Sequence, residues 1–87
     1  MRIAFHKNFE KEYRKLRESE KRRVKAHLAL FIKDPFVPLL NNHPLKGTYT
    51  GYRSINVGGD LRAIYKSVGR DTAVFTVIGR HGKLYSS

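Results

Sequence analysis

The chain contains no cysteine, so disulfide bonds and cysteine-liganded zinc sites are excluded. This absence suits a reducing cytoplasm and is equally compatible with other compartments. No run of about 18 apolar residues is present, and the first six residues lack the apolar centre of a signal peptide. We therefore expect neither export nor membrane insertion, and we predict a cytoplasmic protein.

Acidic residues are also scarce. Eighteen lysines and arginines stand against seven aspartates and glutamates, which gives a formal charge of +11 on 87 residues. Such a charge attracts polyanions, because neutralising phosphates releases their counterions. RNA, DNA and acidic protein segments are candidate partners, and a basic protein with only nonspecific affinity is the alternative.

The length predicts a single domain over residues 1–87, with no room for a module that binds a cofactor.

The spacing of apolar residues predicts one strand, two helices and then three strands. Residues 2–5 are typical of an edge strand, and helical spacing begins at Asn8 and again after Ser19, which can cap the second helix. Residues 35–47 hold all three prolines and are predicted to be a loop. Strands are predicted over residues 49–57, 61–67 and 72–78. The result is an α+β fold of order β-α-α-β-β-β, with a helical hairpin packed on an antiparallel sheet.

The glycine pair at positions 58–59 predicts how the strands beside it are paired. If Val57 lies opposite Asp60, Arg53 and Arg62 stand together on one face of the sheet. Neighbouring like charges repel each other, so this arrangement predicts an anion between the two arginines. In the alternative, the arginines only shield a solvent-facing sheet, and a bulge at the glycines would change the register.

Residues suited to RNA cleavage are concentrated in the second half of the chain. Attack of a ribose 2′-hydroxyl on the adjacent phosphate needs a base, an acid and cations around the phosphate. His81 can act as base or acid near neutral pH, with Asp60 or His43 as the second proton-transfer group. Tyr85 can stack on a nucleobase. The cations available to hold the phosphate or the RNA are Arg62, Arg53, Lys46, Arg80 and Lys83.

Each candidate also has a purely structural interpretation. His43 can be a turn residue beside a proline, and Asp60 is of a type common in hairpin turns. Tyr85 can pack on the sheet as an anchor. The four histidines include no close pair and no carboxylate cluster accompanies them, so we predict no metal site.

Four short motifs follow one another in this half of the chain. They are His43-Pro44-Leu45-Lys46-Gly47, Gly51-Tyr52-Arg53, a hairpin with Asp60, and Ile78-Gly79-Arg80-His81 followed by Tyr85. Their order resembles the RelE/ParE superfamily of bacterial toxins and, within it, the YafQ-like toxins. The resemblance implies a RelE-like two-layer fold and assigns functional roles to His43, Asp60, His81 and Tyr85. Arg62 resembles a strand arginine of the RelE branch.

The chain departs from these families on the strand that follows Tyr52. Ser54 and Asn56 stand where YafQ-like toxins usually carry an acidic residue and a second histidine. Arg53 matches the first of two strand lysines in the RelE branch, whereas Ile55 replaces the second. Because an asparagine cannot transfer a proton, either the remaining residues suffice or catalysis is weaker.

The resemblance implies a toxin of a type II toxin–antitoxin system that cleaves mRNA in the ribosomal A site and so inhibits translation. It also implies a cognate acidic antitoxin, and the basic helical hairpin can bind ribosomal RNA or that antitoxin. Two alternatives keep the fold: a ParE-like inhibitor of DNA gyrase, and a binding module that has lost catalysis. The set of His81, Asp60 and Tyr85 favours the nuclease, whereas the replaced strand residues favour the binding module.

Overall fold

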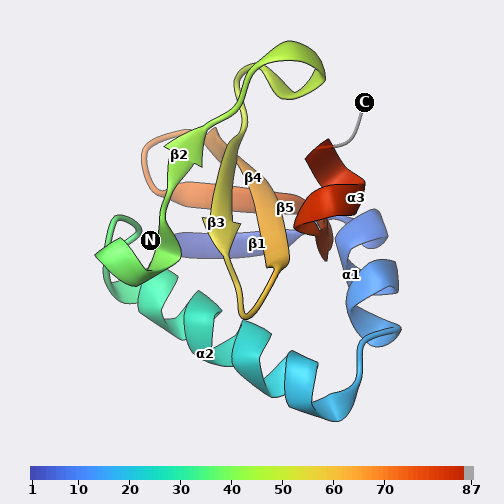
Figure 1. Ribbon diagram of the computed structural model, residues 1–87. Helices are drawn as coiled ribbons and strands as arrows, with labels where there is room; N and C mark the ends of the chain where they lie inside the picture. The colour runs from blue at the N-terminus through green and yellow to red at the C-terminus, as the bar shows by residue number, and fades with distance from the viewer. Residues whose placement is uncertain (86–87) are drawn as a thin grey trace.

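The computed structural model describes the backbone of residues 1–85 and the side chains of residues 1–84. Its described strands form one five-stranded sheet in the order β1-β5-β4-β3-β2 (Figure 1). β1 runs parallel to β5, and the other neighbouring strands are antiparallel. The strands are β1 (Arg2–Phe5), β2 (His43–Pro44), β3 (Arg53–Asn56), β4 (Leu61–Val68) and β5 (Thr72–Arg80).

Two helices follow β1, and a short one follows β5. The helical elements are α1 (Lys7–Arg14), α2 (Glu18–Lys33), the 3-10 helices η1 (Pro38–Leu40) and η2 (Gly47–Tyr49), and α3 (His81–Tyr85). The predicted α+β class and the order of its six elements are confirmed, while β2 and α3 are additions. The sheet is mixed rather than antiparallel, because β1 joins the edge of β5 in the same direction.

Local hydrogen bonds explain where the two long helices begin. At α1, the His6 Nδ1 accepts the Asn8 N–H at 3.0 Å. At α2, the Glu20 carboxylate accepts the Arg17 N–H at 3.1 Å. The prediction that Ser19 caps α2 is wrong, because Arg17 occupies the cap position and Glu20 satisfies its backbone.

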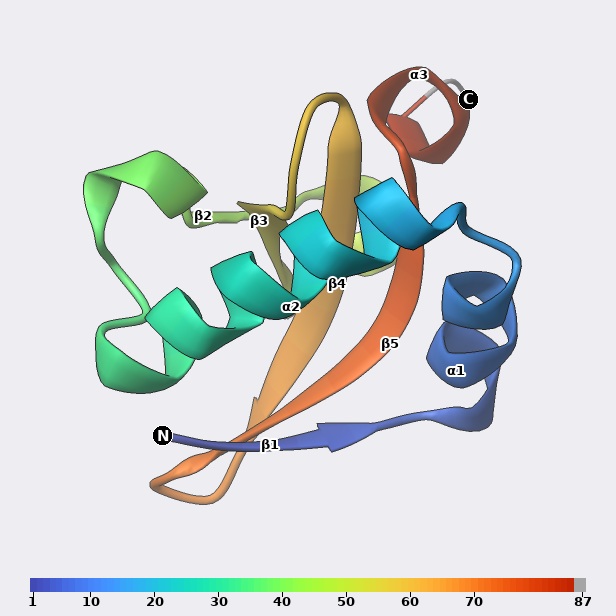
Figure 2. The ribbon, with the colours of Figure 1, turned by 90° about the horizontal axis from the view of Figure 1, so that it is seen from below.

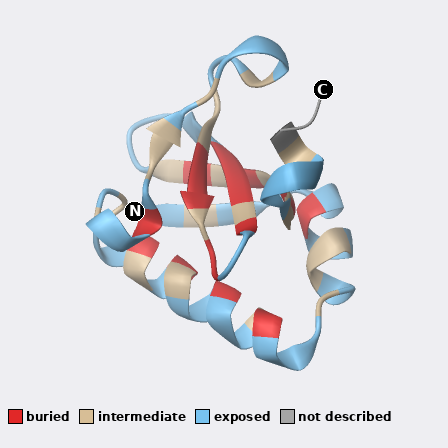
Figure 3. Cartoon of the chain, in the orientation of Figure 1, coloured by how far each residue is buried: buried red, intermediate tan, exposed pale blue. Residues whose placement is uncertain are grey.

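The core lies between α2 and one face of the sheet. Figure 2 shows α2 crossing in front of β4 and β5, and Figure 3 shows buried residues along β3, β4 and the inner side of α2. Phe31 of α2 and Phe75 of β5 are fully buried, with ring centroids 5.2 Å apart. Tyr65 of β4 packs on both rings. The sheet is therefore held to α2 by an aromatic cluster.

The hairpin between β3 and β4 differs from the prediction by one residue. Val57 donates its N–H to the Leu61 carbonyl at 3.1 Å, so Val57 lies opposite Leu61. The loop between them has three residues, and its Gly58 has φ 121° and lies where a Cβ would be 2.9 Å from the Arg23 Cβ. A side chain at position 58 would therefore push the hairpin away from α2.

This shift of one residue places the two arginines on opposite faces. Arg53 is paired with Tyr65 on the face that α2 covers, whereas Arg62 is paired with Asn56 on the other face. The predicted arginine pair is wrong, because each residue added to a hairpin loop exchanges the faces of one strand. We call the face that carries Arg62 the open face because α2 does not cover it, although its residues Ser54 and Ile64 are fully buried.

Candidate functional site

Two rows of residues cross the open face from strand to strand. The first consists of His43, Ser54, Ile64 and Val77, and the second of Asn56, Arg62 and Gly79. At the usual spacing and rise of strands, the Cα atoms of His43 and Arg62 are roughly 12 Å apart. The structure thus brings these two predicted site residues to one face of the sheet.

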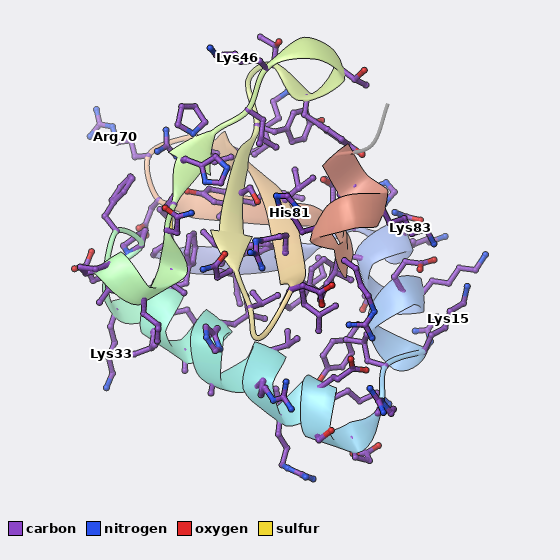
Figure 4. The ribbon with its side chains drawn as sticks, in the orientation of Figure 1. Lys15, Lys33, Lys46, Arg70, His81 and Lys83 are labelled. Atoms are coloured by element: carbon purple, nitrogen blue, oxygen red, sulfur yellow. The ribbon has the colours of Figure 1, made fainter. Side chains whose placement is uncertain are left out.

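His81 lies at the hairpin end of the open face. It begins α3 two residues after Gly79, and its N–H donates to the Asp60 carbonyl at 2.8 Å. Figure 4 shows its side chain between β4 and α3. Gly79 lets α3 approach β5, since a Cβ there would be 3.1 Å from the Leu84 Cδ2. The packing of α3 therefore positions His81 beside β4.

Arg62 borders the same end of the open face. Its Nη1 donates to the carbonyls of Gly59 and Leu61, each at 3.0 Å. These bonds hold the half-buried guanidinium over the hairpin that also binds the His81 backbone. A cation and an imidazole are consequently supported by the same loop.

Two further predicted site residues, Asp60 and Arg80, form an ion-pair cluster with Glu20 on the α2 side. Arg80 donates from Nη2 to the Glu20 carboxylate at 2.7 Å and from Nη1 to the Asp60 carboxylate at 3.0 Å. The hydrogen bonds from Arg80 and from the Arg17 N–H lower the pKa of Glu20, and burial opposes them. The same two carboxylates raise the pKa of Arg80. The cluster joins α2, the hairpin and the end of β5 next to His81.

Replacing Glu20 by glutamine should lower the melting temperature on the order of 5 °C at about pH 7. The lowered pKa means that the carboxylate stabilises the fold above the ordinary value of 4.5, and that this stabilisation disappears as the pH falls through the lower pKa of the folded state. The difference in melting temperature between wild type and variant should therefore shrink toward about pH 3. Glu18→Gln is the control, because Glu18 is 80% exposed. A pH-independent difference would contradict this account.

Arg53 is occupied in a network on the α2 side. Its Nε donates to the Asn42 Oδ1 at 2.7 Å, and the Asn42 amide donates to the Tyr65 hydroxyl at 2.7 Å. Its guanidinium carbon lies 5.3 Å from the centroid of the Phe36 ring. These contacts anchor the loop after α2 to the sheet.

The predicted RNA-binding cations do not form one cluster. Figure 4 shows Lys46 on the loop after β2 and Lys83 on α3, well apart from each other. Lys83 lines a cavity of about 200 Å³ beside Asn8 and Gly79. Arg53 and Arg80 belong to the α2 side. The side chain of Tyr85, also predicted to be functional, lies outside the described residues.

A larger cavity contains residues that the sequence analysis did not select. It has a volume of about 430 Å³, and its lining residues are His6, Asn8, Thr48, Tyr49, Tyr52, Thr76 and Val77. Tyr49 and Tyr52 are close together in the sequence, so the sequence alone could have indicated an aromatic site here. Nothing in the sequence connected them with His6 and Asn8, because these residues come from the other end of the chain.

The sequence matches one protein family over nearly its whole length. A model described as the bacterial toxin of type II toxin–antitoxin system, YafQ, matches residues 1–86. The chain belongs to the YafQ family. It is therefore a toxin of a type II toxin–antitoxin system. Among curated proteins, none matches the sequence.

Solved structures agree with this YafQ family assignment. A crystal structure of YafQ from E. coli has 25% identity and a TM-score of 0.78, covering 99% of this chain and 100% of that one. The toxin in the E. coli DinJ–YafQ toxin–antitoxin complex has 26% identity and a TM-score of 0.75, with coverage of 97% and 96%. The archaeal RelE–RelB complex from Pyrococcus horikoshii shares the fold, with 22% identity, a TM-score of 0.75 and coverage of 94% and 96%.

In this YafQ-family toxin, Asn56 is paired with Arg62 and carries an acceptor oxygen with unusual surroundings. Its Nδ2 contacts the Leu39 carbonyl at 3.5 Å. Its Oδ1 is buried, and no donor among the described residues reaches it. Buried acceptors normally have a partner, so this oxygen is an exception among the described side chains.

Two further properties of the YafQ-family toxin concern metals and membranes. Within residues 1–84, no three histidine, aspartate or glutamate side chains are placed to bind a metal ion together. None of the helices in the described part of the chain has the length and apolar character needed to span a bilayer.

Proposed function

We propose that this toxin is a ribosome-dependent mRNA endoribonuclease that acts in the cytoplasm and inhibits translation. One observation carries the proposal: His81, Arg62 and His43 border the same open face, while the side chains of Arg53, Asp60 and Arg80 are bound on the α2 side. A nuclease needs its proton-transfer groups and its phosphate-binding cation on one accessible surface.

The proposed reaction is attack of a ribose 2′-hydroxyl on the neighbouring phosphate. The bond from the 2′-oxygen to phosphorus forms, the bond to the 5′-oxygen breaks, and the products are a 2′,3′-cyclic phosphate and a 5′-hydroxyl. Arg62 would stabilise the charge of the pentacovalent phosphorus. His81 would transfer a proton as base or acid, with His43 as the second proton-transfer group.

Asp60 has a positioning role in this proposal. Its carboxylate is bound by Arg80, and its carbonyl accepts the His81 N–H. Asp60 would therefore hold His81 against the hairpin. Lys46 and Lys83 would contact the RNA outside the cleavage site, and the expectation that Tyr85 stacks on a base remains part of the proposal.

We also propose a cognate antitoxin as partner. The E. coli YafQ and the archaeal RelE have been crystallised with DinJ and RelB, respectively. The charge of +11 on this chain favours an acidic antitoxin. The basic residues of α1 and α2 would bind that antitoxin or ribosomal RNA.

Replacing Arg62 by alanine tests the proposal directly. We expect a loss of about 10²- to 10³-fold in the cleavage rate, because a cation on the transferred phosphate is removed. The measurement is primer extension of mRNA 5′ ends in a purified translation reaction, with and without ribosomes. Arg70→Ala is the matched control, since Arg70 lies on the β4–β5 turn, away from His81 (Figure 4).

New 5′ ends at A-site codons that require ribosomes and disappear in Arg62→Ala would support the nuclease. Equal cleavage by Arg62→Ala and Arg70→Ala would reject the role of Arg62. If wild type inhibits growth without producing new ends, the nuclease is rejected, and a DNA gyrase supercoiling assay then examines the binding alternative.

A further inference from the structure

The cavity of about 430 Å³ has no part in the reaction proposed above, although it adjoins the open face. One of its lining residues, Val77, lies in the row of His43 and Ile64. Val77 and Gly79 are two residues apart on β5, roughly 7 Å at the usual rise. Gly79 is paired with Arg62. We call this cavity the tyrosine pocket, and it lies about one nucleotide from the proposed phosphate site.

Aromatic rings form one wall of the tyrosine pocket. The ring centroids of Tyr49 and Tyr52 are 6.1 Å apart, and their planes are inclined at 77°. Both residues are only partly buried. An edge-to-face pair leaves a ring face available to a third ring, and nucleobases stack readily on tyrosine. The wall is therefore suited to a flat heteroaromatic ligand.

Hydrogen-bonding groups also line the tyrosine pocket. The His6 Nδ1 accepts the Asn8 N–H at 3.0 Å, so the hydrogen of the neutral imidazole lies on Nε2. The Asn8 Nδ2 donates to the Thr76 carbonyl at 3.2 Å, which leaves Oδ1 as an acceptor. The edges of nucleobases carry both donors and acceptors. A purely apolar ligand would leave these groups unpaired.

A positive charge accompanies the aromatic wall. The Lys66 Nζ lies 5.8 Å from the centroid of the Tyr52 ring. Lys66 is exposed and belongs to β4, the strand that also carries Arg62. A ligand with a ring and a phosphate would use the tyrosines and the lysine together. This combination distinguishes a nucleotide from an uncharged aromatic molecule.

We propose that the tyrosine pocket binds a nucleobase of the RNA next to the cleaved phosphate. This inference rests on the proposed nuclease function for its biological substrate. Tyr52 would stack on the base, His6 and Asn8 would contact its edge, and Lys66 would pair with its phosphate. The pocket would then contribute to the choice of codon.

The test uses the free toxin and nucleoside monophosphates. Titration of AMP, GMP, CMP and UMP into isotope-labelled protein should shift the NMR signals of Tyr52, Asn8 and Val77. Ribose 5-phosphate is the control ligand, because it carries the phosphate without a base. Equal shifts at these residues with ribose 5-phosphate, or none with any nucleotide, would overturn the proposal without the need for a variant.

Two variants sharpen the measurement. Tyr52→Leu should weaken nucleotide binding by about tenfold or more, because stacking on the ring is lost. Tyr52→Phe keeps the ring and should bind within about twofold of wild type. Equal binding by the leucine and phenylalanine variants would also overturn the proposal.

These results do not depend on cleavage. Base-dependent binding by a toxin that does not cut mRNA would reject the nuclease and retain the pocket. Conversely, ribosome-dependent cleavage by a toxin that shows no base-dependent shifts would reject nucleobase binding in the tyrosine pocket and retain the nuclease.

Discussion

Replacing His81 by alanine should lower the rate of mRNA cleavage by about 10²- to 10⁴-fold, the usual contribution of a general acid or base. His81 begins α3, and its backbone N–H is bound to the Asp60 carbonyl, so removal of the imidazole leaves its support intact. The measurement is single-turnover primer extension on ribosomes that carry one defined mRNA. Single-turnover conditions report the chemical step rather than release of the product.

His27→Ala is the matched control for the loss of an imidazole. His27 lies on α2, where its ring contacts the Arg23 carbonyl at 2.7 Å, and it has no place on the open face. Its variant should cleave at the wild-type rate. Full growth inhibition and unchanged cleavage by His81→Ala would contradict the assignment of His81 and would favour a toxin that acts by binding.

Replacing Phe75 by alanine should reduce the free energy of unfolding by about 3–5 kcal/mol. The Phe75 ring is fully buried, and its centroid lies 5.2 Å from the rings of Phe31 and Tyr65. Phe9 packs on it at 5.8 Å. The cavity would open where β5, α1 and α2 meet, which is why the surrounding rings cannot easily close it.

Urea unfolding monitored by circular dichroism measures this loss. Phe36→Ala is the control, since Phe36 is 61% exposed and its Arg53 contact should contribute less than about 1 kcal/mol. A total stability of about 5–15 kcal/mol is typical, so Phe75→Ala would remove a large part of it. Similar midpoints for the two variants would show that the aromatic cluster does not dominate the core.

Periodicity and turn residues sufficed to predict most of the secondary structure. The helical spacing after Ser19 predicted α2, and the loop predicted from residue 35 agrees with the end of α2 at Lys33. The two-residue β2 and the short α3 were missed, because elements of this length have almost no periodic signal. The direction of β1 was also missed, since a single strand at the end of a chain does not specify its neighbour.

The candidate site was predicted less completely than the fold. His43, Arg62 and His81 were selected from motifs, and the structure places them along one face. The predicted pairing of Arg53 with Arg62 is wrong because the loop between β3 and β4 has one residue more than predicted. The length of a hairpin loop decides which face each side chain occupies. Glu20 was not selected at all, because its partner Arg80 is 60 residues away in the sequence.

The sequence by itself determined the strong positive charge, the α+β class and the motifs of the YafQ family, because these depend on composition and on residues near one another in the chain. Only the tertiary structure decided which cations are occupied in ion pairs and which border the open face. It also brought Tyr49 and Tyr52 together with His6 and Asn8 around one cavity. The physical reason is that register and packing join residues across the whole chain, and no local pattern records those contacts.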